Sequence, residues 1–161
     1  MTRGSGPLLV SVHAALLLLL LALAGCTSTP IASPERDAEA KRFLPRADAA
    51  VIYVYRDETG TALDLDTTVL LVNDRLIGST LPGGFFRFDA RAGAHLLQGH
   101  GFDQGRLKID ARNGEITFVS LRTAGGTSDF RLVAPETGKR DILRCCSLLE
   151  NWAPGQRPFL R

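Results

Sequence analysis

The chain has 161 residues, of which 19 are basic and 17 acidic, and its formal net charge is +2 at pH 7. Charges of both signs are scattered, without the clustered basic surface that nucleic-acid binding requires and without a polybasic membrane patch. The length allows one domain with its own core and excludes two. We therefore expect one small domain that does not bind nucleic acid.

The first 25 residues predict a secretory signal peptide. Arg3 gives a positive end, residues 8–23 are almost entirely apolar, and the small residues Ala24 and Gly25 follow. This apolar run is slightly short for a membrane-spanning helix, and no positive flank follows it. The protein is therefore expected to be exported, with residues 1–25 removed.

Cys26 follows directly after the sequence LAG at residues 23–25, and the chain then turns polar. This arrangement resembles the lipobox of bacterial lipoproteins. The resemblance implies signal cleavage between Gly25 and Cys26, a thioether from Cys26 to diacylglycerol, and acylation of the freed amine by a fatty acid such as palmitate. Under the enteric sorting rule, Thr27 in place of Asp favours the outer membrane of a Gram-negative cell, facing the periplasm. An ordinary signal peptide is the alternative.

Residues 26–48 predict a lipidated, flexible tether with prolines and hydroxyl residues near its start. Within it, Ser33 as a cap and Pro34 at the first helical position predict a short helix. Residues 151–161 contain two prolines and a glycine and predict a loose tail. The folded domain is expected between these segments, at residues 49–150.

From residue 49 onward the pattern is typical of β-strands. Eight segments rich in β-branched and aromatic residues are separated by turn residues, with no helical pattern between them. The sequence therefore predicts a mainly β fold, a single antiparallel β-sandwich of about seven or eight short strands. The expected strands are residues 51–56, 67–72, 75–78, 85–89, 95–98, 106–110, 116–121 and 130–133. The residues expected to be buried are Ile52, Val54, Val69, Leu71, Phe88, Ile109, Phe118 and Leu132.

The period changes near the end of the chain. Ile142, Cys145, Cys146 and Leu149 fall at i, i+3, i+4 and i+7, which predicts one amphipathic helix over residues 139–150 that caps the sheet. The two cysteines are then expected to be small buried helix residues. A bridge between them is disfavoured because bridged cysteines usually have Cα atoms farther apart than one trans peptide allows. Pairing with a second copy stays open in the oxidising periplasm.

Four sequence segments carry a resemblance to a known family. They are AVIYVYR at residues 50–56, VNDRLIG at 72–78, GFFRF at 84–88 and AGAH at 92–95. Their order is similar to that in bacterial lipoproteins of the domain of unknown function 2846 family, over about residues 48–138. The resemblance implies a small β-sandwich with no established activity, and so no catalytic residues to transfer.

Two groups of side chains offer possible metal ligands. His95, His100 and Asp103 lie close in sequence, but an odd separation on a strand places the two histidines on opposite faces. Each histidine is therefore expected to make a structural hydrogen bond. The second group is acidic and consists of Asp57, Glu58, Asp64 and Asp66. It lacks the ligand spacing and the glycine of a calcium-binding loop, so it is expected to be a solvated loop.

The sequence contains none of the common catalytic motifs for hydrolysis or nucleotide binding. Cys146 would need a nearby histidine to act as a nucleophile. We therefore expect no enzyme, no metal and no cofactor. Tyr53 and Phe85 are expected in the core, with an open sheet face for a partner as the alternative.

The expected function is that of a non-enzymatic binding or scaffold module, attached to the membrane through Cys26 and contacting another protein of the cell envelope. A carrier of a small ligand or lipid is the second possibility. A hydrolase with a site assembled from distant residues is the third.

Overall fold

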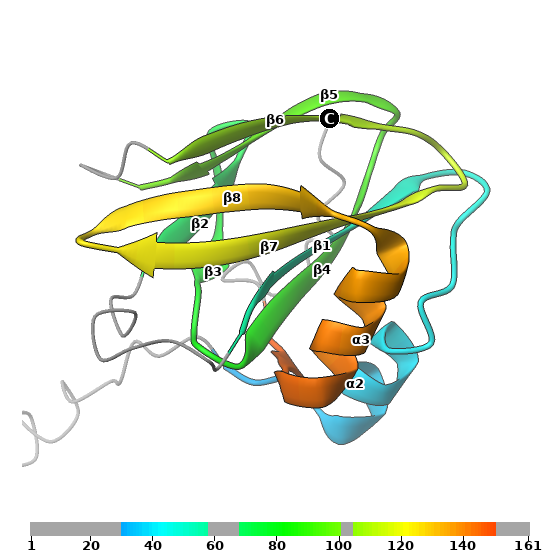
Figure 1. Ribbon diagram of the computed structural model, residues 1–161. Coiled ribbons are helices and arrows are strands. Elements are labelled where there is room, and N and C mark those ends of the chain that lie inside the picture. The colour runs from blue at the N-terminus through cyan, green and yellow to red at the C-terminus, as the bar shows by residue number, and fades with distance from the viewer. Residues whose placement is uncertain (1–29, 58–67, 101–104, 151–161) are drawn as a thin grey trace, which may run out of the picture.

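The computed structural model describes residues 30–57, 68–100 and 105–150 (Figure 1). These residues form a three-layered molecule, in which a five-stranded sheet lies between a four-stranded sheet and a layer of two helices. The strand orders are β8-β7-β1-β4-β9 and β3-β2-β5-β6. The bounds are α2 (Pro34–Ala40), β1 (Ala50–Arg56), β2 (Val69–Val72), β3 (Arg75–Ser79), β4 (Gly84–Ala90), β5 (Gly93–Gly99), β6 (Arg106–Ala111), β7 (Ile116–Ala124), β8 (Thr127–Val133), α3 (Pro135–Cys145) and β9 (Ser147–Leu148).

The expected mainly β sandwich with a helix near the C-terminal end is confirmed. The five-stranded sheet is mixed, however, because β1 pairs with β7 in parallel and β4 pairs with β9 in parallel. The sequence pattern did not show this because parallel and antiparallel strands share the same alternation. From β1 the chain crosses to β2 and β3 in the second sheet and returns at β4, antiparallel to β1. It then crosses again to β5 and β6 and returns at β7, parallel to β1. No helix within the described ranges is long and apolar enough to cross a bilayer.

Strand β1 lies at the centre of the sheet and is buried on both faces. Ile52 and Val54 point into the core between the two sheets, whereas Val51, Tyr53 and Tyr55 point toward the helices. This explains its continuous apolar sequence, which a half-exposed strand would not need. The molecule therefore has two cores, one on each face of the same strand.

The hairpin between β2 and β3 turns at Asn73 and Asp74, which both adopt positive φ, as the sequence predicts. The core-facing side of β2 was predicted wrongly. Val69 and Leu71 were expected to be buried, but they are half-buried and Leu70 enters the core. All four residues of β2 are apolar, so the alternation gave no preferred face. Leu132 is also not buried. It lies near the end of β8, an edge strand of the five-stranded sheet, and is 57% exposed.

The C-terminal helix differs from its predicted bounds of 139–150. It begins at Pro135, a residue suited to the first helical position, and ends at Cys145. Cys146 is already extended, and the following residues form β9 beside β4. Leu149, which shares the helical spacing, packs into the core between the sheets instead. The helical spacing from Ile142 to Leu149 therefore runs across two different elements, the end of α3 and the extended segment after it.

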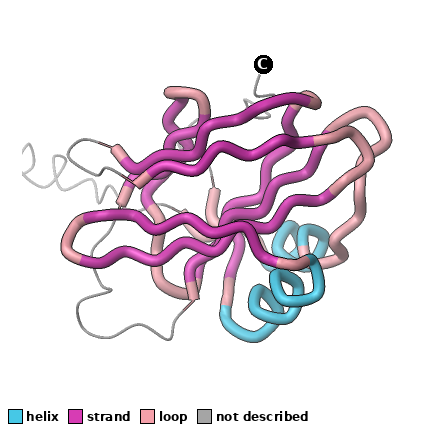
Figure 2. Tube along the Cα trace, turned by 45° about the horizontal axis from the view of Figure 1, so that its top comes forward, coloured by secondary structure: helices cyan, strands magenta, loops and turns pink. Residues whose placement is uncertain are grey.

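Both helices cover the outer face of the five-stranded sheet (Figures 1 and 2). Helix α3 approaches β7 at Gly138, where an added Cβ would lie 2.5 Å from ring carbons of Phe118. Helix α2 has the predicted Ser33 cap, whose Oγ accepts a hydrogen bond from the Arg36 amide. Residues 30–48 were expected to be part of a tether. Instead, Ala32, Ala40 and Phe43 pack with the sheet, so the folded unit begins near residue 30.

Candidate functional site: the helix-covered face and the paired chain ends

The predicted lipidation and cleavage residues, Cys26 and Gly25, lie outside the described residues. The same is true of four predicted polar candidates, namely Glu58, Asp64, Asp66 and Asp103. The lipidation site therefore stays a prediction.

The two ends of the described domain are paired with each other. The Glu150 amide donates to the Pro30 carbonyl at 2.8 Å, and the Ala32 amide donates to the Leu148 carbonyl at 2.8 Å. Ile31 and Leu149 form an antiparallel bridge between them. These contacts continue the edge of the sheet beyond β9, and they fix the point at which the chain enters the domain.

Side chains reinforce this pairing. The Asp37 carboxylate on α2 accepts the Leu148 amide at 2.7 Å, and Arg36 forms an ion pair with Glu150. The paired ends, meaning residues 30–32 and 148–150, therefore hold α2 in place. Ile31 is 65% exposed and presents an apolar side chain to solvent at this position.

Four aromatic rings fill the space between the sheet and the helices. The Tyr53 ring lies 5.1 Å from Phe118 and 5.3 Å from Phe43, measured between centroids, and 6.0 Å from Phe85. The Tyr53 hydroxyl donates to the Ala40 carbonyl at 2.6 Å, and burial raises the pKa of Tyr53. Tyr53 and Phe85 are fully buried. Both are core residues, as expected, and the helices occupy the sheet face that a partner would otherwise use.

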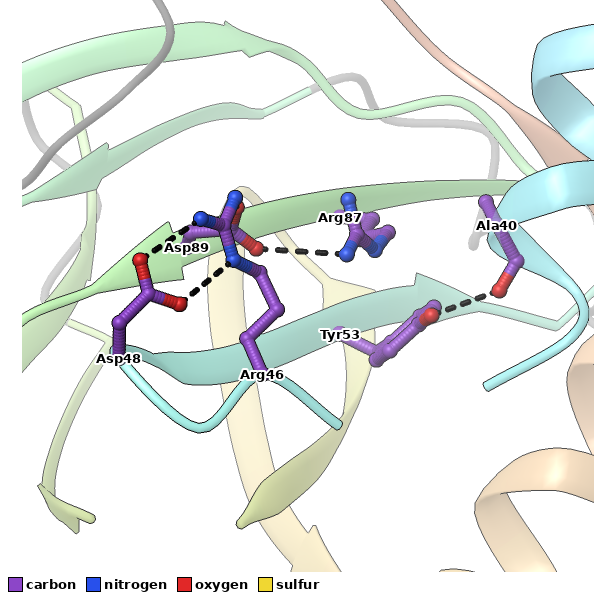
Figure 3. A network of polar contacts seen from close by, with 6 residues as sticks. All are labelled: Ala40, Arg46, Asp48, Tyr53, Arg87 and Asp89. Carbon is purple, nitrogen blue, oxygen red and sulfur yellow. Dashed lines mark hydrogen bonds and ion pairs between the residues drawn. The ribbon is translucent and has the colours of Figure 1, made fainter. Parts of the chain in front are cut away.

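An ion-pair cluster lies beside this core (Figure 3). Arg46 donates to both oxygens of Asp48, at 2.9 and 3.2 Å, and to Asp89 on β4 at 2.8 Å. Arg87 lies 3.4 Å from the same Asp89. The hydrogen bond from Arg46 lowers the pKa of Asp48, and the hydrogen bond to Asp48 raises the pKa of Arg46. The cluster attaches the segment before β1 to the neighbouring strand, a structural role that nothing in the sequence pattern indicated.

Cys145 and Cys146 form a disulfide with each other, so the prediction of two unbridged helix cysteines is wrong. The backbone changes from helical at Cys145 to extended at Cys146, and the sequence pattern missed this change because it continued the helix. Cys146 is buried, with its Sγ 3.6 Å from the Arg56 carbonyl oxygen. A disulfide sulfur carries no proton and is no nucleophile, so neither cysteine can start covalent catalysis in this state.

A second polar group joins α3 to the end of β1. The Tyr55 hydroxyl donates to Asp141 at 2.9 Å, and Arg144 pairs with Asp57 and lies 3.7 Å from Asp141. Burial, followed by the hydrogen bond to Asp141, raises the pKa of Tyr55 far above its ordinary value. Asp57 is the one described member of the predicted acidic loop, and its partner is an arginine.

His95 makes the structural hydrogen bonds that the sequence predicts. Its Nε2 donates to the Arg91 backbone carbonyl at 2.8 Å, and its Nδ1 accepts from the side-chain Nδ2 of Asn73 at 2.9 Å, an assignment that follows from these partners. The side-chain Oδ1 of Asn73 accepts from the Leu96 backbone amide. The side chains of His95 and Asn73 therefore bind the β2–β3 turn to β5. In the part of the chain that the structure describes, no three His, Cys, Asp or Glu residues gather as metal ligands.

The fold and these contacts define a small β-sandwich protein whose mixed sheet is covered by two helices. No family model and no solved structure matches the chain. A protein of Haemophilus influenzae, described only as uncharacterized, is 31% identical to it over 137 residues, which cover 81% of this chain and 80% of the relative. The chain belongs to the family of that protein.

Proposed function

We propose that the protein is an outer-membrane lipoprotein that faces the periplasm and serves as a non-enzymatic binding or scaffold module for another envelope component. The observation that carries the proposal is the sequence LAGC at residues 23–26, directly after a charged start and an apolar run. The resemblance to lipoproteins of the domain of unknown function 2846 family is part of the same proposal.

Two features of the structure support it. A disulfide between Cys145 and Cys146 fits an oxidising compartment such as the periplasm. The space between the sheets is filled by large buried side chains, including Phe86, Phe88 and Leu97. A filled interior favours an interaction module over the carrier alternative, which needs a ligand-sized cavity.

Incorporation of labelled palmitate into the full-length protein in a Gram-negative host tests the lipid attachment. Wild-type protein should incorporate label and stay attached to membranes, because the resemblance implies three acyl chains and two are enough for stable anchoring. It should sediment with the outer membrane, as Thr27 after the lipidated cysteine implies. Cys26→Ala should lose both properties. The double variant Cys145→Ser/Cys146→Ser is the matched control and should keep them. Label on Cys26→Ala, or none on the wild type, contradicts the proposal.

The scaffold role needs a separate experiment. Affinity capture of the lipidated protein from solubilised envelopes, followed by mass spectrometry, should return one envelope protein in a constant ratio. The same protein should be captured by a soluble form that lacks residues 1–29, because the proposed partner binds the folded domain. Co-purification of lipid alone would instead favour the carrier alternative.

A further inference from the structure

We infer that the paired ends of the domain, residues 30–32 and 148–150, face and contact the phospholipid headgroup layer. The inference rests on the proposed lipidation of Cys26. It assigns an orientation to the domain and a membrane-facing surface, which lipidation alone does not supply.

The first step is the reach of the chain. Only three residues separate Cys26 from Pro30. Four peptide steps span at most about 14 Å even when fully extended. A domain of this size has a radius of gyration of about 13 Å, so its diameter is at least twice the length of the spacer. Whatever the conformation of the spacer, Pro30 cannot lie far from the lipid.

The second step is that residues 30–32 cannot lengthen the spacer without cost. They are held by the hydrogen bonds from Glu150 to Pro30 and from Ala32 to Leu148, each 2.8 Å long. Just beyond them on α2, Arg36 pairs with Glu150 and Asp37 accepts the Leu148 amide, which holds the adjoining helix to the same chain end. The membrane-proximal point is therefore a fixed place on the folded surface. Its most exposed apolar side chain is that of Ile31, which is available to enter the interfacial region.

The third step comes from the other chain end. Because Glu150 is hydrogen-bonded to Pro30, the chain leaves the domain beside the point where it enters. Trp152 follows Glu150 by two positions in the sequence. Tryptophan is enriched at membrane–water interfaces, where its ring and its N–H suit the headgroup region. Residues 151–161 also contain Arg157 and Arg161 and no acidic residue, a composition that suits a phosphate-rich surface.

The chain supplies its own reporter, since Trp152 is its one tryptophan. We would reconstitute the lipidated mature protein, which begins at Cys26 in the proposed processing, into phospholipid vesicles whose acyl chains carry bromine near the headgroup, and measure quenching of Trp152 fluorescence. The reference is the variant Trp152→Phe/Lys108→Trp. Lys108 is exposed on β6, one edge strand of the four-stranded sheet. The other edge strand is β3, whose Gly78 lies next to Glu150. Lys108 is therefore on the side of this sheet that is away from the paired ends. Quenching of Trp152 should be several-fold stronger than quenching at position 108.

A second reporter uses the described surface itself. In Trp152→Phe/Ile31→Trp, the new tryptophan replaces a side chain that is mostly exposed, and it should also be quenched several-fold more than the one at position 108. Equal quenching at all three positions, or stronger quenching at 108, would overturn the inference. Intact mass of the same samples separates the two proposals. Acylated protein without the quenching difference refutes the orientation alone, whereas protein without acyl chains refutes the proposed function and the orientation together.

Discussion

At the scale of single residues, two tyrosines link the helices to the sheet. The Tyr53 hydroxyl binds the Ala40 carbonyl at the end of α2, and the Tyr55 hydroxyl binds Asp141 on α3. Burial raises the pKa of both hydroxyls above the ordinary value of 10.0, and Asp141 adds to the rise at Tyr55. Each tyrosine therefore keeps its proton to higher pH in the folded chain than in the unfolded chain.

The free energy of unfolding should consequently decline in alkaline solution. The contribution of the tyrosines is complete below pH 10.0, the unfolded value, and is lost as the pH rises through the higher folded values. The limiting slope is about 1.4 kcal/mol per pH unit for each tyrosine. Urea unfolding at a series of pH values measures it. The variant Tyr53→Phe/Tyr55→Phe removes both tyrosines of the chain and should lose most of the slope; an unchanged slope would refute this account.

The disulfide between Cys145 and Cys146 should contribute little to equilibrium stability. A cross-link between neighbours closes almost no loop, so it removes little entropy from the unfolded chain. Urea unfolding with and without a reductant should give free energies that agree within about 1 kcal/mol. Thiol titration of the untreated protein should find no free thiol at either position. A large loss of stability on reduction would show that the bond stabilises the native junction of α3 and β9.

At the scale of elements, Gly138 sets how closely α3 lies on β7. The Phe118 ring occupies the place where a Cβ would stand, so Gly138→Ala must push the helix outward or force the ring to move. We expect a loss of about 1–3 kcal/mol in urea unfolding, despite the better helix propensity of alanine. Lys139→Ala is the matched control on the same helix and should change stability by less than about 0.5 kcal/mol. Equal stability of the two variants would mean that the contact can relax without cost.

Elements with strong local signals were predictable from the sequence, and those defined by distant contacts were not. The Asn73-Asp74 turn, the Ser33-Pro34 helix start and the buried run of β1 all depend on residues within a short window. The face of β2, the parallel partner of β1 and the end of α3 depend on what packs against them. For the candidate site, the core positions of Tyr53 and Phe85 were expected, but the disulfide and the Arg46 cluster were not. Their partners are set by the path of the folded backbone.

At the scale of the whole molecule, the segment that the sequence predicts as a tether is part of the folded unit. Residues 32–43 cover one side of the Tyr53 ring cluster and provide the acceptor for its hydroxyl. Arg36, Asp37 and the paired ends connect this segment to the C-terminal strand. The folded unit therefore includes most of the segment, residues 26–48, that the sequence predicts as a tether.

This difference can be tested by truncation. A chain that begins at residue 30 should show a cooperative thermal transition by circular dichroism. A chain that begins at residue 49 should lose on the order of 5 kcal/mol, because it exposes the ring cluster and leaves Tyr53 without its acceptor. Equal melting temperatures for the two chains would show that residues 30–48 are dispensable. A mostly helical spectrum of the longer chain would contradict the fold.

The pairing of Pro30 with Glu150 also sets the order in which the molecule can be completed. Residues 30–32 can pair only after residues 148–150 are present. Strand β1 likewise pairs with β7, whose paired residues lie about 65 positions later in the chain. Such distant pairings give high contact order and slow folding. Under the proposed export, the chain would emerge from its translocation channel N-terminus first, and this domain would close only after nearly all of it had crossed. Until then the apolar β1 strand would stay uncovered, which would make the newly exported chain a client for chaperones.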